Sequence, residues 1–271
     1  MSILSQLREI ALQPHPGFSQ EEFIIHGQWG FELFFRPNPL ERTFHYDVLV
    51  YQTLRQGCCY CALGKPTLDP SLMGMDARTV TAPSSDHEIA LLDSVYSVFE
   101  QGYELEHVLK GLSSEKALQR ADIVADEVVY QLQDIASRRK PRVVMVGVVG
   151  NIIKKLASAG LEVLATDLEP GLVNSTIHSV PVLNGIEYTP PLVADCDLAL
   201  VSGMTLATST MDEILAQAKA NNTKVVVFAE TGAWLGRELT RSFGVDAVVS
   251  ESFPFYIFEG QSVIRVHRAN K

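Results

Sequence analysis

The stretch that decides the fold is Pro141–Asp167, PRVVMVGVVGNIIKKLASAGLEVLATD. Its first apolar run predicts a buried strand, and the glycine turn GVVG that follows leads into a predicted helix. A second apolar run then predicts a strand that ends in an acid. This order opens a nucleotide-type α/β domain, in which ligands bind at the carboxyl ends of the strands. The stretch therefore predicts the place of a ligand better than its identity.

The same alternation of strands and helices continues to the end of the chain. We predict strands at 142–146, 161–166, 197–201 and 224–228, helices near 150–159, 210–220 and 234–242, and short strands at 247–249, 256–258 and 263–266. Residues 174–193 contain three prolines and are predicted to be mostly loop. The second half of the chain is thus predicted to be an α/β domain with a parallel sheet.

The first half has strands followed by helices, which predicts an α+β domain. A short helix is expected at 2–12 and a hairpin from 23–25 and 31–35. In 43–51, Phe44, Tyr46, Val48 and Val50 share one face of a predicted strand, and 57–63 is predicted to be a fourth strand. Helices are predicted at 86–101 and 114–137, the second with an apolar seam through Leu118, Ala121, Ala125, Val128, Leu132 and Ile135.

Composition excludes several classes of protein. The 271 residues carry a net charge of −10, which disfavours a nucleic-acid partner. No window approaches the roughly 18 apolar residues of a membrane span, and the first residues lack the pattern of a signal peptide. Four cysteines in a chain of this length do not make a disulfide framework. These features predict a reduced, cytoplasmic protein without a membrane partner.

The glycine turn gives the first candidate site. Gly147 allows the sharp turn out of its strand, and the next helix would present free N–H groups to an anion. Asp167 follows Gly147 by 20 residues, at the position from which an acid reaches a ribose hydroxyl. The alternative is that Gly147 only turns the chain and Asp167 is a solvated strand end.

The second candidate site is Ser202–Thr210, SGMTLATST, between a strand and a helix. Its five hydroxyl side chains exceed what one helix cap needs and suit a carboxylate or phosphate group. Thr210 and Glu213 have the spacing of a capping box, so capping explains one or two of them. The candidate ligand-binding residues here are Gly203, Thr205, Thr208 and Thr210.

The third candidate site, Glu230-Thr231-Gly232, follows the strand KVVVF. Together with Asp167 and Glu169, Glu230 would place three acids around one crevice, and hard cations bind such oxygen ligands. Exposed loop acids are the alternative. A metal remains an open assignment, and no catalytic residue is assigned, because no Ser/His/Asp set follows from spacing alone.

Cys58, Cys59 and Cys61 form a cluster whose role the sequence leaves open. On a strand, Cys59 and Cys61 share a face while Cys58 points away, and the partner pair that a structural zinc site needs is not evident. Small buried hydrophobes are the favoured interpretation.

These blocks together resemble the putative heavy-metal-chelation family. The resemblance rests on VMVGVVGNIIKKL, on TDLEPG, on DCDLALVSGMTLATSTMDEIL and on VVVFAETGAWLGRELTRSFGVDAVV, and is best over about 141–258. The chain departs from the family at Thr208, where an Asn is usual, and at 229–233, where a Gly-Pro-Ser-type turn is usual.

The resemblance implies an enolase N-terminal-like α+β domain at 1–112, a bridging helix at 113–139 and a Rossmann-like α/β domain at 140–271, with a ligand crevice between the domains. It also implies a homodimer and a function in binding a metal ion or a small metal chelate. In that function the Gly203 to Thr210 segment would hold an anionic group, and the three acids would ligate or repel charge. One alternative is a transferase or lyase that uses a nucleotide-type cofactor, and another is a scaffold without a working pocket. Divalent or transition metals are the other candidate cofactors.

Overall fold

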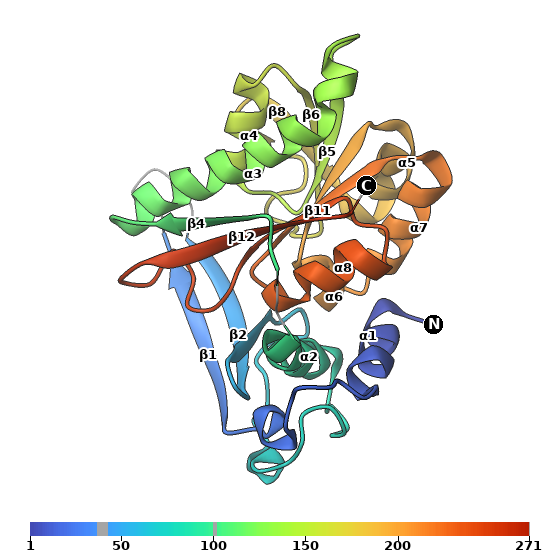
Figure 1. Cartoon of the computed structure of the whole chain (residues 1–271). Helices are drawn as coiled ribbons and strands as arrows, with labels where there is room; N and C mark the ends of the chain where they lie inside the picture. The colour runs from blue at the N-terminus through green and yellow to red at the C-terminus, as the bar shows by residue number, and fades with distance from the viewer. Residues whose placement is uncertain (37–42, 100–101, 271) are drawn as a thin grey trace.

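The two kinds of sequence pattern build two separate sheets (Figure 1). The computed structural model describes residues 1–36, 43–99 and 102–270. The first part forms a three-stranded antiparallel sheet in the order β1-β2-β3, with helices packed against it. Its elements are α1 (Ile3–Leu12), a 3₁₀ turn at Gln20–Phe23, β1 (Gly27–Phe35), β2 (Phe44–Gln52), β3 (Gln56–Tyr60), a 3₁₀ turn at Pro70–Leu72, and α2 (Ser85–Phe99).

The second part forms a nine-stranded sheet in the order β4-β12-β11-β10-β9-β5-β6-β8-β7. The strands from β11 to β8 in this order are parallel, which confirms the predicted α/β architecture. Its elements are β4 (Leu105–Leu109), α3 (Ser113–Ala136), β5 (Arg142–Val146), α4 (Gly150–Ser158), β6 (Glu162–Asp167), β7 (Thr176–Ile177), β8 (Val180–Asn184), α5 (Gly185–Asp195), β9 (Leu198–Ser202), α6 (Met204–Ala207), α7 (Met211–Asn221), β10 (Lys224–Ala229), a 3₁₀ turn at Ala233–Leu235, α8 (Gly236–Ser242), β11 (Ala247–Glu251) and β12 (Ser262–Arg268).

The order of the strands creates a switch point beside β5. The chain runs from β5 to β6 and β8 on one side and then returns to β9 on the other. In open α/β sheets the crevice at such a point, outside the carboxyl ends of the strands, is where ligands bind. The switch point therefore lies between the ends of β5 and β9.

The prediction that 174–193 is mostly loop is wrong, because this segment forms β7, β8 and α5. Pro190 and Pro191 lie inside α5. The carbonyl groups that lose their helical partners belong to Ile186 and Glu187, which are exposed residues that water can hydrate. Asn184 caps the helix by accepting a hydrogen bond from the N–H of Ile186 at 2.9 Å.

Other elements also differ from the prediction. The hairpin partner of β1 is β2 rather than 23–25, and the strand near 57–63 is the third of its sheet and ends at Tyr60. Residues 256–258 form a turn, in which the N–H of Phe258 bonds to the carbonyl oxygen of Phe255. Leu118, predicted on the buried seam of α3, is exposed. Residues 37–42 lie outside the described residues, as do residues 100–101 at the end of the helix predicted at 86–101.

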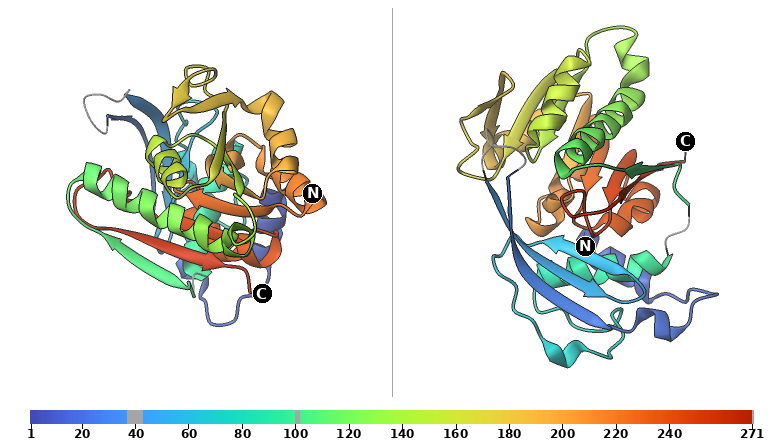
Figure 2. Two further views of the ribbon diagram at one scale, coloured as in Figure 1. Left: turned by 90° about the horizontal axis from the view of Figure 1, so that it is seen from above. Right: turned by 90° about the vertical axis from the view of Figure 1, so that its left-hand side faces the viewer.

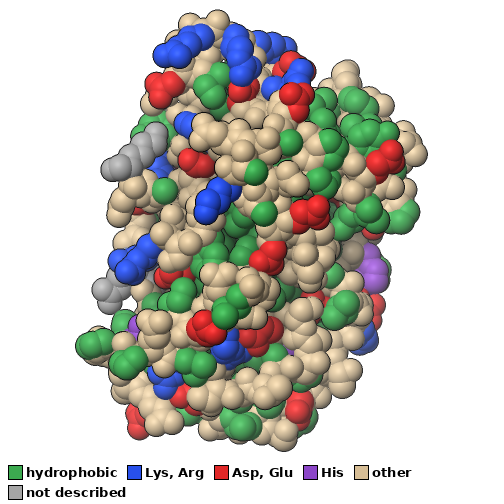
Figure 3. Space-filling view, turned by 90° about the vertical axis from the view of Figure 1, so that its right-hand side faces the viewer, with side chains coloured by type: hydrophobic (Ala, Val, Ile, Leu, Met, Phe, Trp, Pro, Cys, Tyr) green, Lys and Arg blue, Asp and Glu red, His purple; other side chains and the backbone are tan. Residues whose placement is uncertain are grey.

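Strand β4, which the sequence did not predict, pairs with β12 at the edge of the large sheet. Helix α3 also packs on this sheet, through Ala121, Val124, Val128 and Leu132. By these contacts, β4 and α3 pack with the second sheet, and the domain boundaries at 112 and 139 stay predictions. Within the described residues, no helix has the length and apolar character needed to cross a membrane. Charged side chains of both signs are spread over the face shown in Figure 3.

A hydrogen-bonded seam holds the small sheet against the ends of the large one, below which it lies in Figure 1 and in the right-hand view of Figure 2. The carboxylate of Asp93 on α2 accepts hydrogen bonds from the N–H groups of Cys58 and Trp234, at 2.8 and 2.7 Å. The N–H of Gly232 bonds to the carbonyl oxygen of Cys58 at 3.1 Å. Gly57 lets α2 approach β3, since a Cβ there would lie 2.0 Å from the backbone nitrogen of Ser94.

We expect Asp93→Asn to lower the free energy of unfolding by about 2 kcal/mol, because the amide nitrogen would leave one buried N–H without an acceptor. Urea unfolding measures this change. The exposed Asp134→Asn on α3 is the control and should change stability by less than about 0.5 kcal/mol. Equal effects of the two substitutions would contradict the role of Asp93 in the seam.

Candidate functional site

A cavity of about 120 Å³ lies between the two sheets, at the switch point of the large one. The second part of the chain supplies its floor from the ends of β5, β9 and β10, and from α3. These floor residues are Val148, Val149, Gly150, Asn151, Ser202, Met204, Phe228, Glu230, Thr231, Ala117 and Arg120. The small sheet covers them with side chains of β1, β2 and β3, namely Leu33, Phe35, Phe44, Tyr46 and Tyr60, and Tyr256 and Ile257 complete the wall.

Three charged side chains form a buried triad at the floor of this cavity. Arg120 lies between Glu230, at 3.0 Å from its Nη2, and Glu251, at 3.4 Å from its Nε. Burial opposes the charge of Arg120, but the charges of Glu230 and Glu251 outweigh it and raise the pKa of the guanidinium above its ordinary value. Burial, together with the charge of Glu230, raises the pKa of Glu251 to about 7, against the effect of Arg120.

Aromatic rings pack around the triad. The Arg120 guanidinium lies 5.4 Å from the ring centroid of Tyr256, within the range of a cation–π contact. The ring of Tyr256 in turn lies 6.0 Å from Phe35 of β1, and Tyr46 lies 4.9 Å from Tyr60. Both sheets therefore contribute rings to one cluster around the cavity.

The loop that carries Tyr256 is anchored by a second residue of α3. Lys116 is buried, and its Nζ donates hydrogen bonds to the carbonyl oxygens of Phe258 and Gly260, at 2.7 and 2.8 Å. Lys116, Ala117 and Arg120 therefore form one face of α3 that both fixes this loop and lines the cavity.

The residues predicted to bind a ligand at the glycine turn stabilise the turn instead. Gly147 has φ +86°, and a Cβ there would lie 2.7 Å from the Cβ of Ser202, so both conformation and space require glycine. The carboxylate oxygens of Asp167 accept hydrogen bonds from the N–H groups of Val148 and Glu169, each at 2.8 Å. Glu169 is exposed. Gly147, Asp167 and Glu169 do not line the cavity, although Val148 does.

The hydroxyl-rich segment also bonds mainly to its own backbone. The hydroxyls of Thr205 and Thr208 donate to the carbonyl oxygens of Ser202 and Met204, at 2.7 and 3.3 Å. The hydroxyl of Thr210 lies 3.0 Å from that of Thr208 and does not cap α7, so the predicted capping box is not formed.

The glycine of this segment is needed for packing. A Cβ on Gly203 would lie 2.5 Å from the carbonyl oxygen of Thr231. None of the four predicted residues of this segment lines the cavity, whereas Ser202 and Met204 beside them do.

The third predicted segment does reach the cavity, through Glu230 and Thr231. The hydroxyl of Thr231 accepts a hydrogen bond from the N–H of Tyr60 at 2.9 Å. Gly232 has φ +68° and belongs to the seam with β3. One loop thus binds the small sheet and presents a carboxylate to the cavity.

The three predicted acids do not form a shared cluster. Across the described residues, no group of three or more His, Cys, Asp or Glu side chains is arranged to hold a metal ion. Cys58 and Cys59 are buried in the core, and burial raises the pKa of both thiols. This placement agrees with their interpretation as small hydrophobes.

The sequence did not predict that Arg120, Glu251 and Tyr256 belong to the site, or that the small sheet covers the cavity. A signal for Arg120 was present, because it lies three residues after Ala117 and four before Val124, on the buried stripe of α3. A charged residue on such a stripe needs a buried partner. Its partners could not be identified from the sequence, since they lie more than 100 positions away.

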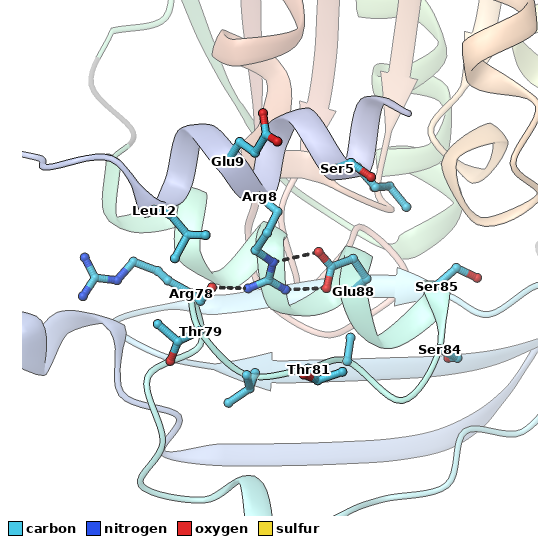
Figure 4. Close-up of a pocket in the computed structure, with 13 residues that line it drawn as sticks. Ser5, Arg8, Glu9, Leu12, Arg78, Thr79, Thr81, Ser84, Ser85 and Glu88 are labelled. Carbon is cyan, nitrogen blue, oxygen red and sulfur yellow. Dashed lines mark hydrogen bonds and ion pairs between the residues drawn. The ribbon is translucent and has the colours of Figure 1, made fainter. Parts of the chain in front are cut away.

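A larger groove, of about 760 Å³, runs between α1 and the segment before α2 (Figure 4). Arg8 crosses it and donates hydrogen bonds to the carboxylate of Glu88 and to the carbonyl oxygens of Ala77 and Arg78. Arg78 pairs with Asp76. Arg8 thus holds α1 against α2 and the segment before it, whereas Arg78 pairs within its own segment, and the groove lies away from the strand ends.

The fold and the cavity define the class: an α/β protein with a Rossmann-like domain preceded by a smaller α+β domain. The family model described as putative heavy-metal chelation matches residues 131–249, which confirms the family resemblance over this part of the chain. None of the curated proteins matches the chain in sequence.

Two solved structures of proteins of unknown function from the family that this model describes share the fold over almost the whole chain. The protein of Pyrococcus horikoshii is 13% identical, with a TM-score of 0.57 over 98% of this chain and 99% of that one. The protein of Desulfitobacterium hafniense is 11% identical, with a TM-score of 0.55 over 97% and 98%. At these identities the likeness shows the fold alone.

The raised pKa of Glu251 predicts a pH-dependent stability. This carboxyl group titrates near pH 4.5 when unfolded and at about 7 when folded. Its stabilising contribution is therefore complete below pH 4.5 and is lost as the pH rises through 7. We expect the stability of Glu251→Gln relative to the parent to increase by about 2 kcal/mol from pH 5 to pH 8.

Urea unfolding of both proteins at the two pH values measures this difference. The pKa of His267, which burial lowers to about 4, affects both proteins alike and cancels in the comparison. The exposed Glu213→Gln is the control and should show the same relative stability at both pH values. A difference for Glu251→Gln that does not change with pH would contradict the assignment.

Proposed function

We propose that this chain binds a small organic chelator, or its metal complex, in the cavity between the two sheets. The observation that supports this most is the Glu230–Arg120–Glu251 triad at the floor of an aromatic-walled cavity at the switch point. Ligand sites are commonly apolar hollows with a few convergent polar groups at such switch points. The description of the family as concerned with heavy-metal chelation agrees with this ligand class.

A chelate fits the lining better than a bare metal ion does. Among the described residues that line the cavity, Glu230 is the one carboxylate, and the rest are mostly apolar or aromatic. A metal ion bound there would depend on donor atoms brought by an organic ligand. The cavity of about 120 Å³ is well below the roughly 300–1,000 Å³ of drug-sized ligand sites, so a portion about the size of one ring would enter it.

The alternative of an enzyme with a nucleotide-type cofactor depends on Asp167 reaching a ribose. Both oxygens of Asp167 accept hydrogen bonds from the backbone of its own turn, and the residue does not line the cavity. No contact among the residues that the structure describes favours this alternative over the chelate.

A thermal-shift panel tests the proposal with named probes: Ni²⁺ alone, 2-(aminomethyl)pyridine alone, and their complex. We expect the complex at 100 times its Kd to raise Tm by about 5 °C, because a ligand of the native state stabilises by mass action. The metal alone should give a smaller shift. Equal shifts with Ni²⁺ alone and with the complex would contradict chelate binding.

A cavity-filling variant locates the binding. Ala117→Met should abolish the shift given by the complex, because the longer side chain occupies the cavity without removing a charge. Ala136→Met, at the exposed end of the same helix, should leave the shift unchanged. Binding that survives Ala117→Met would place the site elsewhere.

A further inference from the structure

The buried triad is unbalanced in charge. Arg120 contributes +1 and the two carboxylates contribute −2 when both are ionised, which leaves −1 at a site where Arg120 and Glu251 are buried and Glu230 is largely buried. The phenols around it do not change this count at neutral pH, because burial raises the pKa of Tyr60 and of Tyr256. An uncompensated buried charge is costly, so the triad should hold either one proton or one additional cation.

The two carboxylates are not equivalent. Glu230 lines the cavity and has the shorter contact with Arg120, whereas Glu251 lies beneath, with 1% of its surface exposed. Apart from its ion pair with Arg120, neither oxygen of Glu251 accepts a well-aligned hydrogen bond from the residues that the structure describes. Glu251 is therefore the carboxylate that carries the proton, which agrees with its raised pKa.

The groups that face Glu251 come from several elements. They are Arg120 on α3, Glu230 after β10, Tyr256 in the loop after β11, and the hydroxyl of Ser262 on β12. Among these, Arg120 and Glu230 form an ion pair with each other, with 3.0 Å between Nη2 and Oε1. The protonation of Glu251 thus responds to any new charge placed beside Glu230.

The cavity beside Glu230 has walls that suit a positive charge. Aromatic rings of Phe35, Phe44, Tyr46 and Tyr256 line it, and such rings attract cations. The turn before α4, whose N–H groups attract anions, already holds a carboxylate of the chain, because Asp167 accepts the hydrogen bond of Val148. Both features favour a cation over an anion in this cavity.

We propose that the ligand of this cavity carries a positive charge, as a small organic cation or a cationic metal chelate, and that its binding beside Glu230 expels a proton from Glu251 to solvent. Before binding, Arg120 (+1), Glu230 (−1) and protonated Glu251 (0) sum to zero. After binding, the ligand and Arg120 (+2) balance two ionised carboxylates (−2). The inference rests on the proposed function, because it requires that the cavity bind a small ligand.

Three probes of nearly the same shape test the charge of the ligand: choline, the neutral 3,3-dimethylbutan-1-ol and the anionic 3,3-dimethylbutanoate. We expect choline to bind about tenfold more tightly than the alcohol, from its cation–π and carboxylate contacts. Titration calorimetry at pH 6.0 in two buffers of different ionisation enthalpy should show about one proton released per choline bound.

Two variants separate the parts of the inference. Glu251→Gln should still bind choline but release no proton, and Glu230→Gln should lose the preference for choline over the alcohol. Glu213→Gln, on the surface of α7, should behave as the parent does.

The outcomes distinguish this inference from the proposed function. If the alcohol or the anion binds as tightly as choline, the cavity binds a small ligand but the charge assignment is wrong. If choline binds to the parent without proton release at pH 6.0, the exchange is wrong. If none of the three probes binds while the Ni²⁺ complex raises Tm, the cavity binds a chelate but this inference is wrong. If the complex also gives no shift, the proposed function fails together with this inference.

Discussion

The backbone of β3 is hydrogen-bonded to the loop that follows β10, and the rest of the site depends on this contact. Thr231 and Gly232 bind β3, while Asp93 holds the N–H groups of Cys58 and Trp234. Without this seam the small sheet would not cover the ends of β5, β9 and β10, and the cavity would be an open sheet edge. The same loop carries Glu230, so domain docking and the position of the cavity carboxylate are set together.

The loop that forms this seam also carries Glu230 of the charged triad. Taking Arg120 and two carboxylates out of water opposes folding, and buried ion pairs replaced by well-packed apolar groups are often neutral or stabilising. A contribution to folding stability alone therefore does not account for the triad. Its position on the floor of the cavity, facing aromatic rings from both sheets, agrees instead with a role in binding.

The sequence predicted the α/β half well because its signals are local. Apolar runs of strand length alternate with helical periodicity from Pro141 onward, and four of the predicted strands are β5, β6, β9 and β10. It failed at 174–193, where the prolines indicated loop although α5 tolerates them on its exposed side. It also missed β4, a short edge strand whose Leu105 and Val108 are partly exposed and whose pairing with β12 spans about 150 positions.

The candidate site could be predicted only as far as the sheet edge on which it lies. Hydroxyls and acids after strand ends were expected to bind a ligand, but Thr205, Thr208 and Asp167 mainly satisfy backbone groups of sharp turns. In such turns some N–H and C=O groups have no partner in a helix or sheet, and nearby polar side chains form hydrogen bonds with them instead. Glu230 differs from these residues, because its carboxylate pairs with Arg120, while its neighbours Thr231 and Gly232 bond to the backbone of β3. Whether a polar residue after a strand bonds to its own turn or faces a cavity depends on partners far away in the chain, and the sequence alone does not show them.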